Sequence, residues 1–356
     1  MEICFVGDIM LGRLVNDRLR RTGPVHPWGD VLPVLAGADV RIGNLECVLS
    51  DGGVPWPGKT FHFRSDTRNV ACLEAAGFDA VSLANNHVLD YDADALLDTL
   101  RALDARRILH AGAGRDRNAA RRPALWDVRG TRLGLVALTD NEPGWEATGR
   151  APGVHHVPID PDDVRARDLL ETVRDLRDRT GLLIVSAHWG GNWGTAVPRA
   201  HRAFARALID AGADVVYGHS PHITRGIEVH RGRPILYGTG DFVDDYAVDP
   251  VERNDESFIF LLRTGADGRG RGQNPRRQPH ELQLVPTVIE DCSARLAGPR
   301  DAARMARRMQ RLCAELGTPS TWREDLGWLV VPLDSEGDSE GDAGAAGPGP
   351  GTSPFA

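Results

Sequence analysis

Five short apolar runs, separated by stretches with helical periodicity, constrain the fold of this chain more than any other feature. They occupy residues 3–6, 40–42, 80–83, 182–186 and 215–217. Runs made mostly of Val, Ile, Leu and Phe are typical of strands that are buried on both faces. Strands that alternate with helices predict an α/β fold in which neighbouring strands run parallel.

A residue that can bind a metal follows each of these runs closely. Because the carboxyl ends of parallel strands meet at one edge of a sheet, we expect these side chains to gather at a single rim. In chain order, they are Asp8, Glu46, Asn86, His188 and His219, with His222 three residues after His219.

This mixture of oxygen and imidazole donors indicates the kind of ion. It suits Mn, Fe, Zn, Co or Ni better than Ca, whose sites consist almost entirely of oxygen. Gly-Asp and Gly-Asn pairs also build turns and helix caps, which would explain Asp8, Asn44 or Asn85 taken singly. That explanation does not cover three histidines, so we expect a divalent-metal site with one or two ions.

The segments that carry these residues resemble a known family. Residues 5–13 (FVGDIMLGR), 43–46 (GNLE), 84–90 (ANNHVLD), 188–190 (HWG) and 218–222 (GHSPH) resemble the CapA family, named for poly-γ-glutamate capsule synthesis, within the calcineurin-like metallophosphoesterase superfamily. The resemblance covers about residues 1–245. It implies an α/β fold of the calcineurin-like metallophosphatase type, a four-layer α/β/β/α sandwich with a metal site at the strand ends.

The resemblance also implies roles for single residues. Six would bind metal, with Glu46 in the bridging place: Asp8, Glu46, Asn86, His188, His219 and His222. Asn86, His188 and His219 would complete one metal position, and His222 would belong to the other. His87 would be the acid that contacts the reacting group, so that the catalytic residues would be His87, Asp8 and His222.

Two positions depart from the pattern that the resemblance implies. Met10 stands where the superfamily usually has a histidine ligand, which weakens one of the two metal positions. Asp241 stands where the family usually has an asparagine. Its carboxylate is open to three interpretations: a partner of a metal-bound histidine, a general base, or a turn residue.

Cationic and aromatic residues near these motifs are candidates for substrate binding. Arg13, Lys59 and Arg64 suit an anionic small molecule or peptide, because guanidinium and ammonium groups bind carboxylates and phosphates. Trp189 and Trp193 would form an apolar wall of the substrate site, and Asp241 is a further candidate for substrate binding. The alternatives are that Trp189 packs in the core and that Arg64 pairs with a structural aspartate.

The reaction stays open at this point. Metal-activated water would hydrolyse an amide or a phosphoester, whereas a polarised carbonyl would acidify a Cα proton and allow epimerisation, as in the peptide-tailoring epimerases of lasso-peptide pathways that the resemblance includes. We therefore expect a metal-dependent enzyme acting on a peptide or poly-glutamate-like substrate. The alternatives are a phosphoesterase and a non-catalytic scaffold for capsule or peptide assembly.

Composition limits the partners. A net charge of -8 argues against binding to nucleic acid. The first strand begins at residue 3, which leaves no room for a signal peptide, and no apolar run is long enough to span a bilayer. We therefore expect a cytoplasmic protein without a membrane partner, and the sequence leaves its oligomeric state open. Five cysteines without a repeated spacing indicate free thiols.

The remaining pattern predicts one domain over residues 1–333, with C-terminal strands and a helix in 255–333. We expect a mobile loop at 265–280 and a disordered tail at 334–356, which is rich in Gly, Ser and acidic residues. Helices are predicted at 69–76, 92–105, 160–179, 198–211 and 299–316. Hairpins are predicted at 125–138 and 227–237, and two further strands at 257–261 and 281–289.

Overall fold

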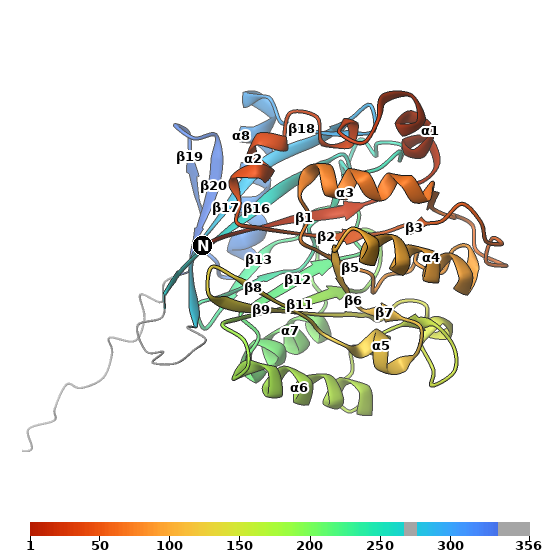
Figure 1. Cartoon of the computed structure of the whole chain (residues 1–356). Helices are drawn as coiled ribbons and strands as arrows, with labels where there is room; N and C mark the ends of the chain where they lie inside the picture. The colour runs from red at the N-terminus through yellow and green to blue at the C-terminus, as the bar shows by residue number, and fades with distance from the viewer. Residues whose placement is uncertain (267–275, 334–356) are drawn as a thin grey trace, which may run out of the picture.

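The computed structural model describes residues 1–266 and 276–333, and it shows two β-sheets that face each other (Figure 1). Apolar side chains from both sheets, such as Phe5, Leu135 and Tyr217, form a central core between them. A second core lies between the first sheet and its helices, and a third between the second sheet and its helices. The chain is thus a mixed α/β protein with four layers.

The first sheet is mixed and carries ten strands. Its parallel part is β1–β2–β5–β6, and an antiparallel part continues from the other edge of β1 through β16, β17, β20 and β19. The short strand β15 pairs in parallel with the end of β1, and β18 pairs with β17. The bounds are β1 Glu2–Ile9, β2 Val40–Leu45, β5 Ala80–Ser82, β6 Leu109–Ala111, β15 Asp241–Val243, β16 Glu256–Ala266, β17 Arg277–Glu290, β18 Ser293–Leu296, β19 Thr321–Arg323 and β20 Trp328–Pro332.

The second sheet has six strands in the order β13–β14–β12–β11–β9–β8. Its four central strands are parallel, and β8 and β13 close the edges through antiparallel hairpins. The bounds are β8 Ala124–Val128, β9 Thr131–Thr139, β11 Leu182–His188, β12 Val215–His219, β13 Ile227–His230 and β14 Arg233–Leu236.

Helices cover the outer faces of both sheets (Figure 1). The first sheet is covered by α1 (Arg13–Thr22), α2 (Leu32–Gly37), α3 (Val70–Ala76) and α4 (Asp92–Ala105), and the second by α6 (Val164–Arg177) and α7 (Arg199–Ala211). The last helix, α8 (Pro299–Glu315), packs Met305 and Met309 into the central core. The remaining short elements are β3 (Val48–Leu49), β4 (Arg64–Ser65), β7 (Ala113–Gly114), β10 (Gly153–Val154), α5 (Arg117–Arg121), and the 3-10 helices η1 (His26–Trp28), η2 (Thr67–Asn69) and η3 (Pro143–Trp145).

Most predicted elements are present with shifted ends. The helix predicted at 160–179 begins only at Val164, because the Asp163 side chain accepts a hydrogen bond from the backbone of Arg165 and caps it. The predicted bounds of the loop at 265–280 are wrong, because β16 reaches Ala266 and β17 starts at Arg277. Residues 267–275 and the predicted tail at 334–356 lie outside the described residues. Within 1–266 and 276–333, no helix is both long and apolar enough to cross a membrane.

Candidate metal centre

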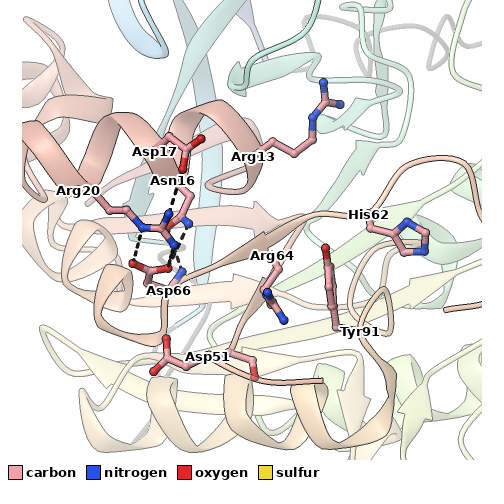
Figure 2. A pocket seen from close by; sticks show the side chains of 10 residues that line it. Arg13, Asn16, Asp17, Arg20, Asp51, His62, Arg64, Asp66 and Tyr91 are labelled. Carbon is pink, nitrogen blue, oxygen red and sulfur yellow. Dashed lines mark hydrogen bonds and ion pairs between the residues drawn. The ribbon is translucent and has the colours of Figure 1, made fainter. Parts of the chain in front are cut away.

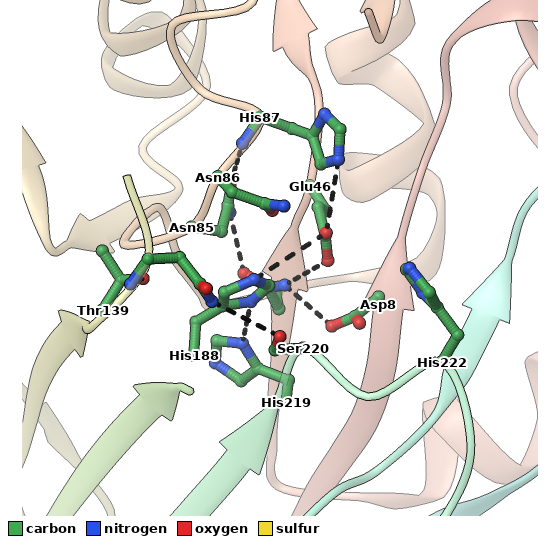
Figure 3. Close-up of polar contacts among 12 residues, drawn as sticks. Asp8, Glu46, Asn85, Asn86, His87, Thr139, His188, His219, Ser220 and His222 are labelled. Atoms are coloured by element: carbon green, nitrogen blue, oxygen red, sulfur yellow. Dashed lines mark hydrogen bonds and ion pairs between the residues drawn. The ribbon is translucent and has the colours of Figure 1, made fainter. Parts of the chain in front are cut away.

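The strands of both sheets bring the predicted ligands to one rim (Figure 3). Asp8 lies near the end of β1, Glu46 directly after β2, and Asn86 in the loop after β5. From the facing sheet, His188 and His219 are the last residues of β11 and β12. All but Asn86 are 6% exposed or less, and so is His222. The expected meeting of these side chains is therefore a feature of the structure.

Asn44, which the sequence suggested only as a turn residue, organises the carboxylates. Its Nδ2 donates to Asp8 Oδ1 at 2.7 Å and to Glu46 Oε2 at 2.9 Å. Its own Oδ1 accepts from Asn85 Nδ2 at 2.9 Å. Successive side chains of a strand alternate between faces, so the spacing of Asn44 and Glu46 was the available signal that they lie on one side.

The two histidines of the second sheet lie against each other. His188 Nδ1 is 2.9 Å from His219 Nδ1, and Ser186 Oγ is 2.6 Å from His219 Nε2. His188 Nε2 has no hydrogen-bond partner and lies 4.0 Å from Glu46 Oε1. This nitrogen is therefore available to a ligand in the space beside Glu46.

His222 and Asp241 form a second cluster around Asp8. His222 Nδ1 is 2.9 Å from Asp241 Oδ1. Asp241 is the first residue of β15, and the register of β15 on β1 places it directly opposite Asp8. Gly7 permits this approach, because a Cβ there would lie 2.0 Å from the carbonyl oxygen of Gly240. The sequence left the role of Asp241 open, and the structure places it inside the candidate centre.

Several buried polar atoms of the rim have no hydrogen-bond partner. Such atoms are rare in folded proteins, because an unpaired buried group costs about 1 to 3 kcal/mol, and more if it is charged. Two overlapping sets of three residues have ligand atoms within 4.8 Å of one another, Asp8–His188–His219 and Asp8–His222–Asp241. The unpartnered atoms are Asp8 Oδ2, Glu46 Oε1, Asn86 Oδ1, His188 Nε2 and Asp241 Oδ2. The donor set thus fits a divalent cation, with Asp8 common to both sets.

The pKa shifts agree with this arrangement. Burial raises the pKa of Asp8 to about 6, and burial together with Asp8 raises the pKa of Glu46 well above its usual range. Burial lowers the pKa of His219 to about 3, and burial and His219 lower the pKa of His188. Carboxylates buried without compensation favour their neutral forms, and a bound cation would favour their charged forms. Neutral imidazole is already the form that binds metal.

His87 is held beside the centre by Asp90, which also forms an ion pair with Lys59. Its Nδ1 is 2.6 Å from Asp90 Oδ2, and Lys59 Nζ is 2.5 Å from Asp90 Oδ1. Lys59 also donates to the backbone oxygen of Asn86. These contacts leave His87 Nε2 facing Glu46 Oε1 at 3.8 Å. Lys59, predicted as a substrate contact, is thus engaged with the buried Asp90, although it also lines the cavity described next.

A cavity of about 450 Å³ opens next to the centre. Arg13 enters it from the start of α1, paired with Asp245 at 3.3 Å, and Trp193 lies edge-on to His222 with ring centroids 5.8 Å apart. Its lining is Arg13, Lys59, Thr60, Phe61, Asn86, His87, Asn192, Trp193, His222, Tyr246, Ala247 and Asn254. Cationic, aromatic and candidate metal-binding side chains therefore share one space.

Trp189 and Arg64, which were predicted as substrate contacts, lie outside this cavity, and Met10 lies outside the candidate centre. Trp189 is fully buried and stacks on His201 in the outer core of the second sheet, so the prediction that it forms a cavity wall is wrong. Arg64 lies in a neighbouring pocket of about 390 Å³, which is also lined by Arg13 (Figure 2). There it covers the ring of Tyr91 and donates to the backbone oxygen of Gly52. Met10 is packed in the outer core of the first sheet.

The fold and the site together define a mixed α/β protein with a candidate metal centre between two sheets, and sequence comparison then gives its family. Residues 2–246 match the family model described as bacterial capsule synthesis protein PGA_cap. The chain therefore belongs to the CapA family of capsule synthesis proteins.

Curated relatives agree with this family. A probable polyglutamine synthesis accessory protein of Mycobacterium tuberculosis is 36% identical over 343 residues, covering 92% of this chain and 87% of the relative. The capsule biosynthesis protein CapA of Bacillus anthracis is 30% identical over 249 residues, covering 69% of this chain and 60% of the relative. A crystal structure of a hypothetical protein from Thermus thermophilus is similar at a TM-score of 0.43 and 15% identity, covering 80% of this chain and 99% of that one.

Proposed function

We propose that this protein is a divalent-metal-dependent hydrolase that cleaves amide bonds in an anionic, glutamate-rich polymer. The main support for this proposal is a set of buried metal-binding atoms at the junction of the two sheets that have no hydrogen-bond partner. They belong to Asp8, Glu46, Asn86, His188 and Asp241. We also assign the four layers to the calcineurin-like metallophosphatase fold, because the candidate centre lies at the strand ends, where the resemblance implies the metal site.

The residues around the centre have the properties that such a reaction requires. A bound divalent cation would supply Lewis acidity and lower the pKa of water to about 7. Asp8, His188 and His219 would hold it. His87 has its Nδ1 fixed by Asp90 and its Nε2 at the edge of the cavity, and burial lowers the pKa of this imidazole to about 4. Neutral His87 is therefore placed to take a proton from the attacking water and to pass it to the leaving amine.

The cavity supports an anionic substrate. Arg13 brings a guanidinium to its mouth, and its side chain is 37% exposed. Guanidinium groups bind carboxylates through paired hydrogen bonds. Exposed Trp193 and Phe61 would cover the methylene groups of a glutamyl side chain. The names of the relatives, which refer to capsule biosynthesis and polyglutamine synthesis, make poly-γ-glutamate the first substrate to test.

The test is incubation of the metal-loaded protein with poly-γ-glutamate oligomers in deuterated water, followed by mass spectrometry. Hydrolysis gives new termini and shorter chains. Deuterium at Cα without shortening would replace hydrolysis by epimerisation, and phosphate release from a phosphoester panel would replace it by phosphoesterase activity. A bound ion with no reaction on any substrate would favour a non-catalytic role in assembly.

A double substitution tests whether cleavage depends on the candidate metal centre. His188→Ala/His219→Ala removes two nitrogen donors and should abolish cleavage together with the ion held by Asp8, His188 and His219. His230→Ala is a matched control, because this histidine pairs with Asp210 at the surface and lies outside the centre. Cleavage that survives in the double variant would refute the proposal.

A further inference from the structure

We infer that Asp241 is a direct ligand of a second, oxygen-rich metal position, formed by Asp8, His222 and Asp241, which prefers a harder ion than the position at His188 and His219. This inference rests on the proposed metal-dependent function. It assigns different chemistry to the two halves of the centre.

Asp241 lies where it can supply a ligand that β1 lacks. Met10, where the resemblance implies a histidine ligand, is packed in the core and is 1% exposed. On the neighbouring strand, β15 pairs in parallel with β1 and places Asp241 opposite Asp8. A donor that β1 itself lacks is thus supplied by the strand beside it.

The second step is the state of the Asp241 carboxylate. The residue is 0% exposed. Its Oδ1 is 2.9 Å from His222 Nδ1, whereas its Oδ2 has no hydrogen-bond partner. A residue that only oriented His222 would need one oxygen. The second oxygen is buried and unpaired, and this carboxylate offers an oxygen within 4.8 Å of ligand atoms on Asp8 and His222, which is the arrangement expected of a metal ligand.

The third step compares the two donor sets. Asp8, His222 and Asp241 supply two carboxylates and one imidazole, whereas Asp8, His188 and His219 supply one carboxylate and two imidazoles. Carboxylate-rich sites suit Mn²⁺ or Mg²⁺, and imidazole-rich sites suit Zn²⁺ or Fe²⁺. Buried Asp244 lies next to Asp241 and also has an unpartnered oxygen, but it belongs to neither donor set.

Sequential loading tests the assignment. Metal-free protein receives one equivalent of Zn²⁺ and then excess Mn²⁺, and bound metals are counted by mass spectrometry after gel filtration, with Mn²⁺ also followed by electron paramagnetic resonance. We expect one Zn and one Mn in the wild type, and one Zn without Mn in Asp241→Asn. Asp244→Asn is the matched control, because it makes the same substitution at the neighbouring buried carboxyl group, which belongs to neither donor set, and it should keep both ions.

A spectroscopic variant separates direct ligation from orientation of His222. In the Co²⁺-loaded Asp241→Cys protein, a thiolate bound to the metal produces a near-ultraviolet charge-transfer band, which the wild type and Asp244→Cys should lack. Circular dichroism checks that each variant is folded.

The outcomes distinguish the two proposals. A wild type that binds no ion would overturn both of them. A wild type that binds Zn but no Mn, an Asp241→Asn protein that keeps its Mn, or an Asp241→Cys protein without the band would overturn this inference and leave the hydrolase proposal standing.

Discussion

The pair of Lys59 and Asp90 gives the sharpest stability prediction. Lys59 is the only lysine of the chain; its side chain is 14% exposed, and that of Asp90 is fully buried. In Lys59→Met, Asp90 keeps two partners at Oδ2, the backbone N–H of Phe63 at 2.7 Å and His87 Nδ1 at 2.6 Å, but Oδ1 loses its cation. Removing one partner of a buried pair costs about 3 to 5 kcal/mol. We expect a loss of about 3 kcal/mol, at the low end because water reaches the lysine.

Urea unfolding of the metal-free protein measures this loss as a change in the free energy of unfolding. Adding Asp90→Asn to Lys59→Met should recover part of it, with a coupling energy of about 1 to 3 kcal/mol. Arg106→Met is the control: it breaks an ion pair with Glu74 whose side chains are 43% and 52% exposed, and it should cost less than about 1 kcal/mol. A loss in Lys59→Met no greater than in this control would refute the reasoning.

Three further predictions concern the centre and its surroundings. Because Asp8, with a pKa of about 6, must be ionised to bind metal, affinity measured by calorimetry should fall as the pH drops through 6 and be about tenfold weaker at pH 5 than at pH 7; a flat profile would contradict this. Trp189→Ala should cost about 3 to 5 kcal/mol in urea unfolding without changing metal content, whereas exposed Trp193→Ala should change stability by less than about 0.5 kcal/mol but weaken substrate binding in fluorescence titrations. Gly7→Ala must push β15 away from β1 and should cost about 1 to 3 kcal/mol and release the second ion, which metal analysis would detect.

Sequence reasoning located the rim because its signal is local. A buried strand reads as an apolar run, and the residue that follows it is already at the carboxyl edge, as Asp8, Glu46, His188 and His219 are. The helix at 92–105 was predicted with its observed ends because leucines repeat at helical spacing within that segment.

Contacts between distant segments were beyond the sequence. That Asp241 lies opposite Asp8 depends on β15 pairing with β1, and nothing within three residues of either position encodes this pairing. Trp189 follows His188 in the chain, but the alternation of strand side chains turns its ring away from the centre and into the core behind the second sheet. The engagement of Lys59 with Asp90 likewise appears only once the loop between β3 and β4 is folded over the site.

The donors of the centre are divided between the two sheets, and this division has a mechanical meaning. Asp8 and Asp241 belong to one sheet, and His188 and His219 to the other. An ion held by Asp8 and His188 together is a crosslink between the halves of the molecule, and its binding free energy adds to the resistance of the sandwich to separation. Depleting the metal would then weaken the contact between the two sheets, so metal supply would affect both the stability of this protein and the proposed reaction.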